Sequence, residues 1–314
     1  MRSHYDYSNC RRRQHRHKLA WYAKGKLKNL TVSNAVEFSK MYSGERDTVL
    51  TVGDQEITFF DNADSAPTAN CAYQYGAHSV AAIHHALHSA GFSGKELHAV
   101  VTLPISEYYG TDHRKNEVNI AKKKANVMTP VAHEQKKPIT ISEVVVYPEG
   151  LPASVSAITS PLRNLNVGDE DHSFLFDFGG TTLDLCLFSG KAQRIERAKS
   201  IELGMFDAFE EVQNTQTKKL SPLAIRKALE TGTAMGGRVE VIREEVTRPL
   251  MRKAATEIVQ FIGDEFISHH FGIGGGAELL ANQLKDHGID VTTFEDSVEV
   301  LAVSIAEIEK PKRE

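Results

Sequence analysis

An aspartate and a run of glycines and threonines lie between two apolar segments in the middle of the chain. Asp177 lies near the end of the segment 174–178, residues 179–182 read Gly-Gly-Thr-Thr, and a second apolar segment follows at 183–188. Glycines let the backbone approach an anion closely, and threonine hydroxyls add hydrogen-bond donors. A carboxylate just before such a turn can hold a hydrated magnesium ion or orient a water molecule. The pattern predicts a β-hairpin whose turn binds phosphate, with an ordinary hairpin and a surface aspartate as the alternative.

A second glycine-rich stretch lies near the C-terminal end of the chain. Gly274, Gly275 and Gly276 lead into an amphipathic segment that begins Ala277-Glu278 and predicts a helix. The N-terminal end of a helix can face an anion or the edge of a nucleotide base. A simple loop before a helix is the alternative interpretation of three glycines.

A third candidate residue is the acid in the sequence Pro148-Glu149-Gly150-Leu151-Pro152, which follows a predicted strand over 139–147. A carboxylate delivered at a strand end and fixed between two prolines is well placed to polarise a water molecule. Taken alone, the feature is also typical of a plain surface loop.

Helices and strands that could position these residues follow from apolar spacing and from turn residues. Short runs separated by turns over 19–62 predict an antiparallel meander. The helices are predicted over 78–91, 116–127, 201–212, from Ser221-Pro222 onward, 238–271 and 298–308, and a buried strand over 97–103 ends at Pro104.

Two groups of side chains on the predicted helices need an interpretation. His84 and His85 are adjacent and therefore point in different directions, so we expect ordinary helix residues rather than a shared metal site. Lys122, Lys123 and Lys124 predict a solvated basic face, with a partner-binding surface as the alternative.

Length and composition limit the class of protein. A chain of 314 residues predicts two lobes, and the polar stretch 164–172 is the best candidate boundary. With 41% hydrophobic and 25% charged residues and a net charge of -4, the composition is that of a soluble globular protein without a general attraction to DNA or membranes. No segment predicts a membrane span or a signal peptide, and three unclustered cysteines fit reduced cytoplasmic thiols.

Taken together, these motifs resemble the ParM or StbA family of plasmid-segregation actin-like ATPases. The resemblance covers roughly residues 18–290 and includes the stretches 80–87, 101–109 and 122–126, the Pro148-Glu149 loop and both glycine-rich motifs. It implies an α/β, actin-like ATPase fold with two RNase H-like lobes flanking a nucleotide cleft. We expect the lobes to span 1–166 and 167–314, with the C-terminal helix as a candidate to return to the first lobe.

The resemblance also implies a role for each candidate residue. Glu149 matches the family's water-activating glutamate, and Asp177 matches the acid that positions magnesium, through water, and the attacking water. The family's phosphate-wrapping residues correspond to Gly179, Gly180, Thr181 and Thr182. Its adenosine motif corresponds to Gly274, Gly275, Gly276 and Glu278. The interpretation takes the two glycine turns to come from separate lobes and to converge on one ATP or GTP with magnesium.

The N-terminus departs from the family pattern. Where the family has Asp-Asp-Gly-Ser-Thr, the first phosphate loop, this chain has Arg11-Arg12-Arg13-Gln14-His15. Guanidinium groups cannot ligate magnesium, so residues 1–17 are either a disordered basic tail or the product of a compensated frameshift. Codons for these five residues, read one nucleotide later, can encode Asp-Asp-Gly-Ser-Thr.

Three functions remain open from the sequence. The first is an ATP hydrolase whose dynamic filaments, formed by self-association, segregate plasmid copies in the cytoplasm through a DNA-binding adaptor protein, with no direct DNA or membrane binding. The second is a nucleotide-binding or filament-forming remnant with impaired hydrolysis, because the first phosphate loop is absent. The third is a small-molecule kinase of the same superfamily.

Overall fold

The computed structural model describes residues 4–8, 16–33, 35–37, 48–60, 74–160, 165–180, 182–294 and 299–312. Contacts divide the chain into a first unit, residues 1–165 with 299–314, and a second unit, residues 166–298. The C-terminal helix therefore belongs to the same unit as the N-terminus. Cys10, Cys71, Thr181 and the stretch 9–15 lie outside the described residues.

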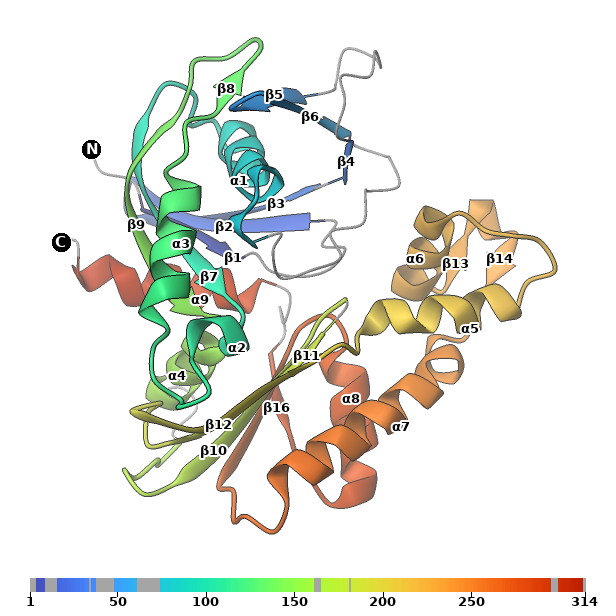
Figure 1. Ribbon diagram of the computed structural model, residues 1–314. Coiled ribbons are helices and arrows are strands. Elements are labelled where there is room, and N and C mark those ends of the chain that lie inside the picture. Colours follow the sequence, from blue (N-terminus) through green and yellow to red (C-terminus); the bar gives the residue numbers. More distant parts are fainter. Residues whose placement is uncertain are drawn as a thin grey trace. The chain divides into compact units, whose positions relative to one another are not determined.

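A five-stranded sheet with the order β3-β2-β1-β7-β9 forms the centre of the first unit (Figure 1). The neighbours β1 and β2 are antiparallel, as are β2 and β3, whereas β1, β7 and β9 run parallel. Because β1 lies within residues 1–17, the segment expected to be a disordered tail contributes a central strand. The strands are β1 (His4–Ser8), β2 (Arg16–Ala23), β3 (Lys26–Ser33), β7 (Glu96–Leu103) and β9 (Thr140–Pro148).

A second sheet in this unit has the order β4-β6-β5-β8. It contains β4 (Ala35–Glu37), β5 (Thr48–Val52), β6 (Gln55–Phe60) and β8 (Ala132–His133). The single meander predicted over 19–62 is therefore wrong, because the hairpins β2/β3 and β5/β6 join different sheets. Turn residues signal a hairpin locally, but they do not specify which sheet it joins.

Helix α1 (Ala77–Ser89) lies between these two sheets (Figure 1). One side of α1 packs through Val80 and Ala81 on the β5/β6 hairpin, and the other packs through Ile83 and Leu87 on the central sheet. Burial on both sides explains why His84, on the same helix, is only 1% exposed.

The remaining helices of the first unit are α2 (Ile105–Tyr108), α3 (Glu117–Val127), α4 (Leu151–Thr159) and α9 (Val300–Glu309), followed by a 3-10 turn, Lys310–Lys312. Helix α9 packs its small residues Ala302 and Ala306 on Ala20 of β2. At its end, Glu309 accepts a hydrogen bond from the Tyr147 hydroxyl at 2.6 Å.

Helix α3 corrects the interpretation of the three lysines. Lys122 and Lys124 are exposed, but Lys123 is fully buried. Its ammonium group donates to the Gln74 side-chain oxygen at 2.7 Å and to the Ser79 hydroxyl at 3.1 Å. The expected solvated face is therefore wrong for Lys123, which ties α3 to the beginning of α1.

The second unit repeats the same sheet plan, with the order β12-β11-β10-β15-β16. The pairs β12/β11 and β11/β10 are antiparallel, whereas β10, β15 and β16 are parallel. The strands are β10 (His172–Phe178), β11 (Leu183–Ser189), β12 (Arg194–Ile201), β15 (His269–Ile273) and β16 (Thr292–Thr293).

Helices cover one face of this second sheet. Phe174, Phe176 and Phe178 of β10 point into a core with Leu250 and Ile258 of the long helix α7. The elements are the 3-10 helices η2 (Met205–Ala208), η3 (Met235–Gly237) and η4 (Lys285–His287), the helices α5 (Phe209–Asn214), α6 (Pro222–Thr231), α7 (Arg243–Ile262) and α8 (Ala277–Leu284), and the small hairpin β13 (Thr233–Ala234) and β14 (Val239–Glu240).

No helix in the described part of the chain is both long and apolar enough to cross a membrane.

Candidate functional site

Both glycine-rich turns follow neighbouring parallel strands of the second unit. Strands β10 and β15 are paired, with Asp177 opposite Ile273, so the turn after Phe178 and the turn after Ile273 leave the same edge of the sheet. The expectation that separate lobes supply these turns is wrong, because both lie within residues 166–298. Their meeting at one sheet edge follows from the parallel pairing of β10 and β15.

Three of the glycines are required by close packing. A Cβ at Gly274, where φ is +95°, would lie 2.4 Å from the Phe178 carbonyl oxygen and 2.6 Å from Asp177 Oδ1. At Gly276 it would lie 2.5 Å from the Phe178 ring, and at Gly180 2.5 Å from the Phe206 ring. No side chain larger than hydrogen fits at these positions without displacement of backbone or rings.

The turn after β10 is fixed by the backbone of η2. The amides of Met205 and Phe206 donate to the carbonyl oxygens of Gly179 and Gly180 at 3.0 and 2.7 Å. In a trans peptide the N–H points opposite to the C=O, so the Gly180 amide points away from η2. This arrangement suits an anion on that side of the turn, because the carbonyl lone pairs are turned away from it.

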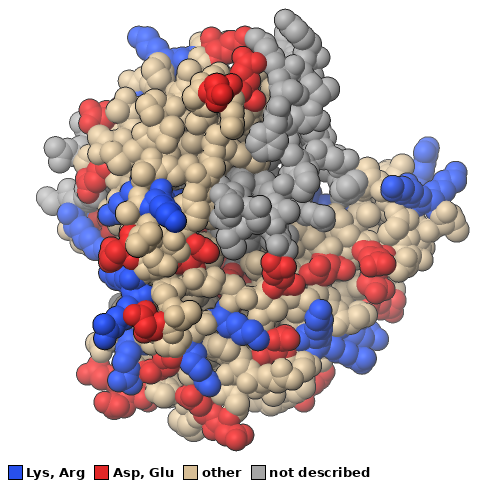
Figure 2. All heavy atoms as spheres, in the orientation of Figure 1, with Lys and Arg blue, Asp and Glu red and all other residues tan. Residues whose placement is uncertain are grey.

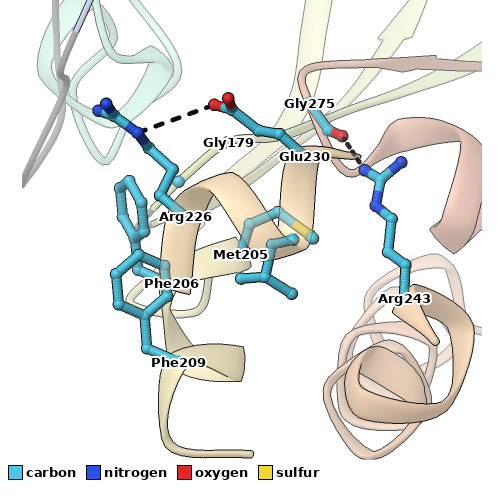
Figure 3. A pocket seen from close by; sticks show the side chains of 10 residues that line it. Gly179, Met205, Phe206, Phe209, Arg226, Glu230, Arg243 and Gly275 are labelled. Carbon is cyan, nitrogen blue, oxygen red and sulfur yellow. Dashed lines mark hydrogen bonds and ion pairs between the residues drawn. The ribbon is translucent and has the colours of Figure 1, made fainter. Parts of the chain in front are cut away.

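A pocket with about 520 Å³ of empty space, partly continuous with solvent, opens beside the two turns (Figure 3). Gly179, Gly180 and Gly275 contribute backbone to its wall. The other lining residues are mostly apolar or aromatic with a few charged groups, as is usual for a small-molecule site: Met205, Phe206, Phe209, Arg226, Leu229, Glu230 and Arg243.

The charged groups of the pocket come from two helices. On α6, Arg226 Nε lies 3.9 Å from Glu230 Oε1, an i, i+4 pair. At the start of α7, Arg243 Nη2 donates to the Gly275 carbonyl oxygen at 3.1 Å. Figure 3 shows both contacts, with the rings of Phe206 and Phe209 edge to face at a centroid distance of 4.8 Å.

Only some of the predicted glycine and threonine residues line the pocket. Gly179, Gly180 and Gly275 line the pocket, whereas Gly274 and Gly276 pack behind it on β10. Thr182 donates its hydroxyl to Asp184 at 3.3 Å. Thr181 lies outside the described residues, and Glu278 is exposed in the first turn of α8, apart from the residues that line the pocket.

Asp177 and Asp184 lie directly opposite each other on β10 and β11. Asp184 is buried and also accepts a hydrogen bond from the Ser200 hydroxyl, whereas Asp177 is half-buried at the strand end. The glycine at 274 leaves room for the Asp177 carboxylate, which lies beside the second glycine turn and is not among the residues that line the pocket. The described residues contain no cluster of three or more histidine, cysteine or acidic side chains that could hold a metal by themselves.

Glu149 belongs to the first unit and follows β9. Its side chain is only 3% exposed, so the interpretation as a plain surface loop is wrong. The Thr102 hydroxyl donates to Glu149 Oε1 at 3.3 Å, and the Glu149 amide donates to the Leu103 carbonyl oxygen at 2.8 Å. The parallel pairing of β7 and β9 thus fixes both the backbone and the carboxylate of Glu149.

Several pocket residues were not predicted from the sequence. Phe206, Phe209 and Arg243 carry no motif, and only the fold brings them to the glycine turns. Arg226 and Glu230 had a detectable signal, since opposite charges four residues apart on a helix are neighbours.

Charged side chains do not gather by sign on the face shown in Figure 2. Lysine and arginine are interspersed with aspartate and glutamate over the described part of that face.

Family models and solved structures show what the chain is similar to. Residues 13–160 match the family model of the N-terminal part of plasmid segregation protein ParM, and residues 175–286 match that of the C-terminal part of an archaeal, MreB-like actin homologue. No curated protein gives a match to the chain.

Solved structures of actin homologues share the fold over nearly the whole chain. The archaeal actin homologue Ta0583 is 14% identical, with a TM-score of 0.72 over 95% of this chain and 96% of that one. The same protein in complex with ADP has a TM-score of 0.70 at 14% identity, over 95% and 96% of the two chains. A subunit of the 15-stranded ParM filament from Clostridium botulinum is 14% identical, with a TM-score of 0.71 over 99% of both chains.

The predicted α/β, actin-like fold is therefore confirmed. The match of residues 13–160 to the ParM model and of residues 175–286 to an actin-homologue model bears out the ParM/StbA-like, actin-like resemblance predicted from the sequence.

Proposed function

We propose that the second unit binds a nucleoside triphosphate, ATP or GTP, together with magnesium, and that the chain hydrolyses it. The observation that carries this proposal is the convergence of two glycine turns at the carboxyl ends of β10 and β15, beside a pocket with apolar and charged walls. Ligands of open α/β sheets bind beyond the carboxyl ends of the strands. The ADP complex of the archaeal homologue supports a nucleotide ligand for this fold.

In this proposal one turn binds the phosphates and the other lies beside the nucleoside. The turn Gly179, Gly180, Thr181 and Thr182 wraps the phosphates, and the carbonyls of Gly179 and Gly180, which face η2, leave the opposite side of the turn to an anion. The turn Gly274–Gly276 lies on the nucleoside side and reaches the pocket through Gly275, whereas a role for Glu278 rests on the resemblance alone. Phe206, Phe209 and Met205 supply the apolar wall that a base requires.

Asp177 is the residue that would hold magnesium, through water. When bound, the ion would neutralise charge that develops on the phosphates. The chain's own contribution is to keep this carboxylate at the strand end, where glycine at 274 leaves space for it.

Glu149 is our candidate for orienting the attacking water and accepting its proton. Glu149 is buried, and its Oε1 accepts a hydrogen bond from the Thr102 hydroxyl at 3.3 Å, which limits the freedom of the carboxylate. Hydrolysis by in-line attack depends mostly on positioning and charge neutralisation, so a fixed carboxylate suits this role.

Similarity to ParM, including a subunit of the ParM filament from Clostridium botulinum, supports self-association into filaments, and we propose that nucleotide state controls it. Bound triphosphate would favour filament contacts and hydrolysis would weaken them, because a ligand shifts an equilibrium toward the state that it binds better. A DNA-binding adaptor protein would link the filament to the plasmid.

A second candidate is a nucleotide-binding or filament-forming protein with impaired hydrolysis. The basic stretch Arg11–His15 favours it, because arginines occupy the place of the first phosphate loop. A small-molecule kinase is a further alternative from the sequence, and no specific observation favours it.

Magnesium-dependent phosphate release and ATP-dependent pelleting, measured on the full chain, test the proposal. We expect both. Pelleting without phosphate release would support the impaired protein, and phosphate transfer to a small molecule would support a kinase. The absence of nucleotide binding would contradict all three.

A further inference from the structure

Arg243 occupies a position that local preference disfavours for arginine. It is the first residue of α7, where the helix dipole is positive. The preceding residue, Ile242, gives no side-chain cap, although a serine, threonine or aspartate there would satisfy a free amide. Departures from local rules of this kind are expected at functional sites.

The contact that Arg243 makes lies in the pocket wall (Figure 3). Its Nη2 donates to the Gly275 carbonyl oxygen at 3.1 Å, and the amide of Gly276 donates to the Phe178 carbonyl oxygen at 3.1 Å. The peptide between Gly275 and Gly276 is thus hydrogen-bonded at both of its polar groups, between α7 and the end of β10.

Packing contributes little on the open side of this peptide. A Cβ at Gly275 would have no neighbour within 4 Å, in contrast to Gly274 and Gly276. The hydrogen bonds therefore have to fix the part of the turn that faces the pocket.

Solvation of the guanidinium does not explain this side-chain conformation. Its Nε is buried and has no hydrogen-bond partner among the residues that the structure describes. Because a buried unpaired donor is unfavourable, the contact with Gly275 is the better explanation of this side-chain conformation.

We propose that Arg243 is a positioning residue of the nucleotide site, which fixes the Gly275–Gly276 peptide against which the nucleoside lies. This inference rests on the proposed function. The clamp acts on the turn beside the apolar wall and not on the phosphate turn after β10. Loss of the guanidinium should therefore weaken ATP and ADP binding by the same factor.

Calorimetric titration of ATP and ADP, each with magnesium, tests the inference on the full chain. Arg243→Met keeps the apolar stem and removes the donors, Arg243→Lys keeps one cation, and Arg252→Met at an exposed position of α7 is the matched control. We expect Arg243→Met to weaken both nucleotides about tenfold or more, as for a lost charged hydrogen bond. Arg243→Lys should lie between it and the unsubstituted chain, and the control should bind normally.

Two results would overturn the role of Arg243 while leaving the proposed function intact. One is unchanged affinity of Arg243→Met, and the other is a loss for ATP that exceeds the loss for ADP. If Arg243→Met does not fold, the lysine variant decides, since intermediate affinity supports the clamp and unchanged affinity contradicts it. Failure of the unsubstituted chain to bind either nucleotide would contradict the proposed function and the clamp together.

Discussion

Neighbouring glycines of the turn after β15 face different surroundings. Gly274 has φ of +95° and would bring a Cβ against the Phe178 carbonyl, whereas Gly275 has open space on that side. The first glycine is therefore needed for folding, and the second is free to serve the pocket.

We predict that Gly274→Ala lowers the free energy of unfolding by about 2–5 kcal/mol, from a positive φ and overpacking. Gly275→Ala should leave stability within about 0.5 kcal/mol, as for substitutions away from packed features, and weaken nucleotide binding, because its methyl group enters the space that the pocket offers. Urea unfolding and nucleotide titration of both variants check this. Equal stability of the two variants would contradict the packing that we describe.

Glu149 gives a second test at a single residue. We predict that Glu149→Gln preserves nucleotide affinity and lowers phosphate release about 10²–10⁴-fold, the usual contribution of a general base, and that it lengthens filament lifetime. Glu149→Ala should act in the same direction. Phosphate release and pelleting are the measurements.

The matched control is Glu143→Gln on β9, the strand that precedes Glu149, where the side chain is 46% exposed and pairs with His98 at 2.9 Å. This control should hydrolyse ATP normally. Unchanged phosphate release in Glu149→Gln would remove Glu149 from the mechanism.

Helix α1 carries histidines that are buried because the helix lies between two sheets. Burial lowers the pKa of His84 to about 4, and burial together with the nearby His133 lowers that of His88 to about 3. Both ring nitrogens of His84 and Nε2 of His88 are buried without a hydrogen-bond partner among the described residues. The helix therefore accommodates these imidazoles in their neutral form.

The stability of the first unit should accordingly fall in mild acid. Between pH 6.5 and the folded-state pKa of about 4, the unfolded chain binds a proton at His84 that the folded chain does not. Stability is therefore fully present above pH 6.5 and declines by about 1.4 kcal/mol per pH unit for this histidine. Urea unfolding at pH 7.5 and pH 5 measures the difference.

His84→Leu, a change of similar volume, should reduce this pH dependence by the share of one histidine. His287→Leu, at an exposed position of the second unit, should leave it unchanged. An identical pH profile in His84→Leu and the original chain would show that His84 is not the group that titrates.

Local signals in the sequence predicted many elements, but the helix predicted over 238–271 is wrong at both ends, because α7 spans only Arg243–Ile262 and the flanking residues form β14 and β15. Other predictions failed where partners are distant. Ser221-Pro222 correctly predicts the start of α6, where the serine hydroxyl accepts from the Ala224 amide at 3.2 Å. The hairpin β10/β11 is likewise encoded by its apolar runs and glycines. Lys123 was misread because its partner Gln74 is 49 residues away, and Phe206 and Arg243 were missed because only tertiary packing brings them to the turns.

The two units repeat one sheet plan, so the basic stretch near the N-terminus can be compared with the phosphate turn of the second unit. The hairpin β1/β2 in the first unit corresponds to β10/β11 in the second, since each begins with a strand parallel to the next central strand. Residues 9–15 therefore hold the chain position that Gly179–Thr182 hold in the second unit. The match to the ParM N-terminal model begins only at residue 13.

We predict that the combined replacement Arg11→Asp, Arg12→Asp, Arg13→Gly, Gln14→Ser and His15→Thr increases magnesium-dependent hydrolysis at least about tenfold, the effect of one added charged interaction. The reason is that carboxylates and glycine can serve magnesium and phosphate where guanidinium groups cannot. Phosphate release with and without magnesium is the readout. Resequencing of the gene gives a separate test, because a stop codon in the shifted frame would exclude the frameshift hypothesis.

A crystal structure of the chain with ADP and magnesium would test the central claim most directly. We expect the phosphates on the Gly179–Thr182 turn and the nucleoside beside Gly275, Phe206 and Arg243. A nucleotide bound elsewhere, or a pocket that stays empty at saturating ADP, would contradict the account.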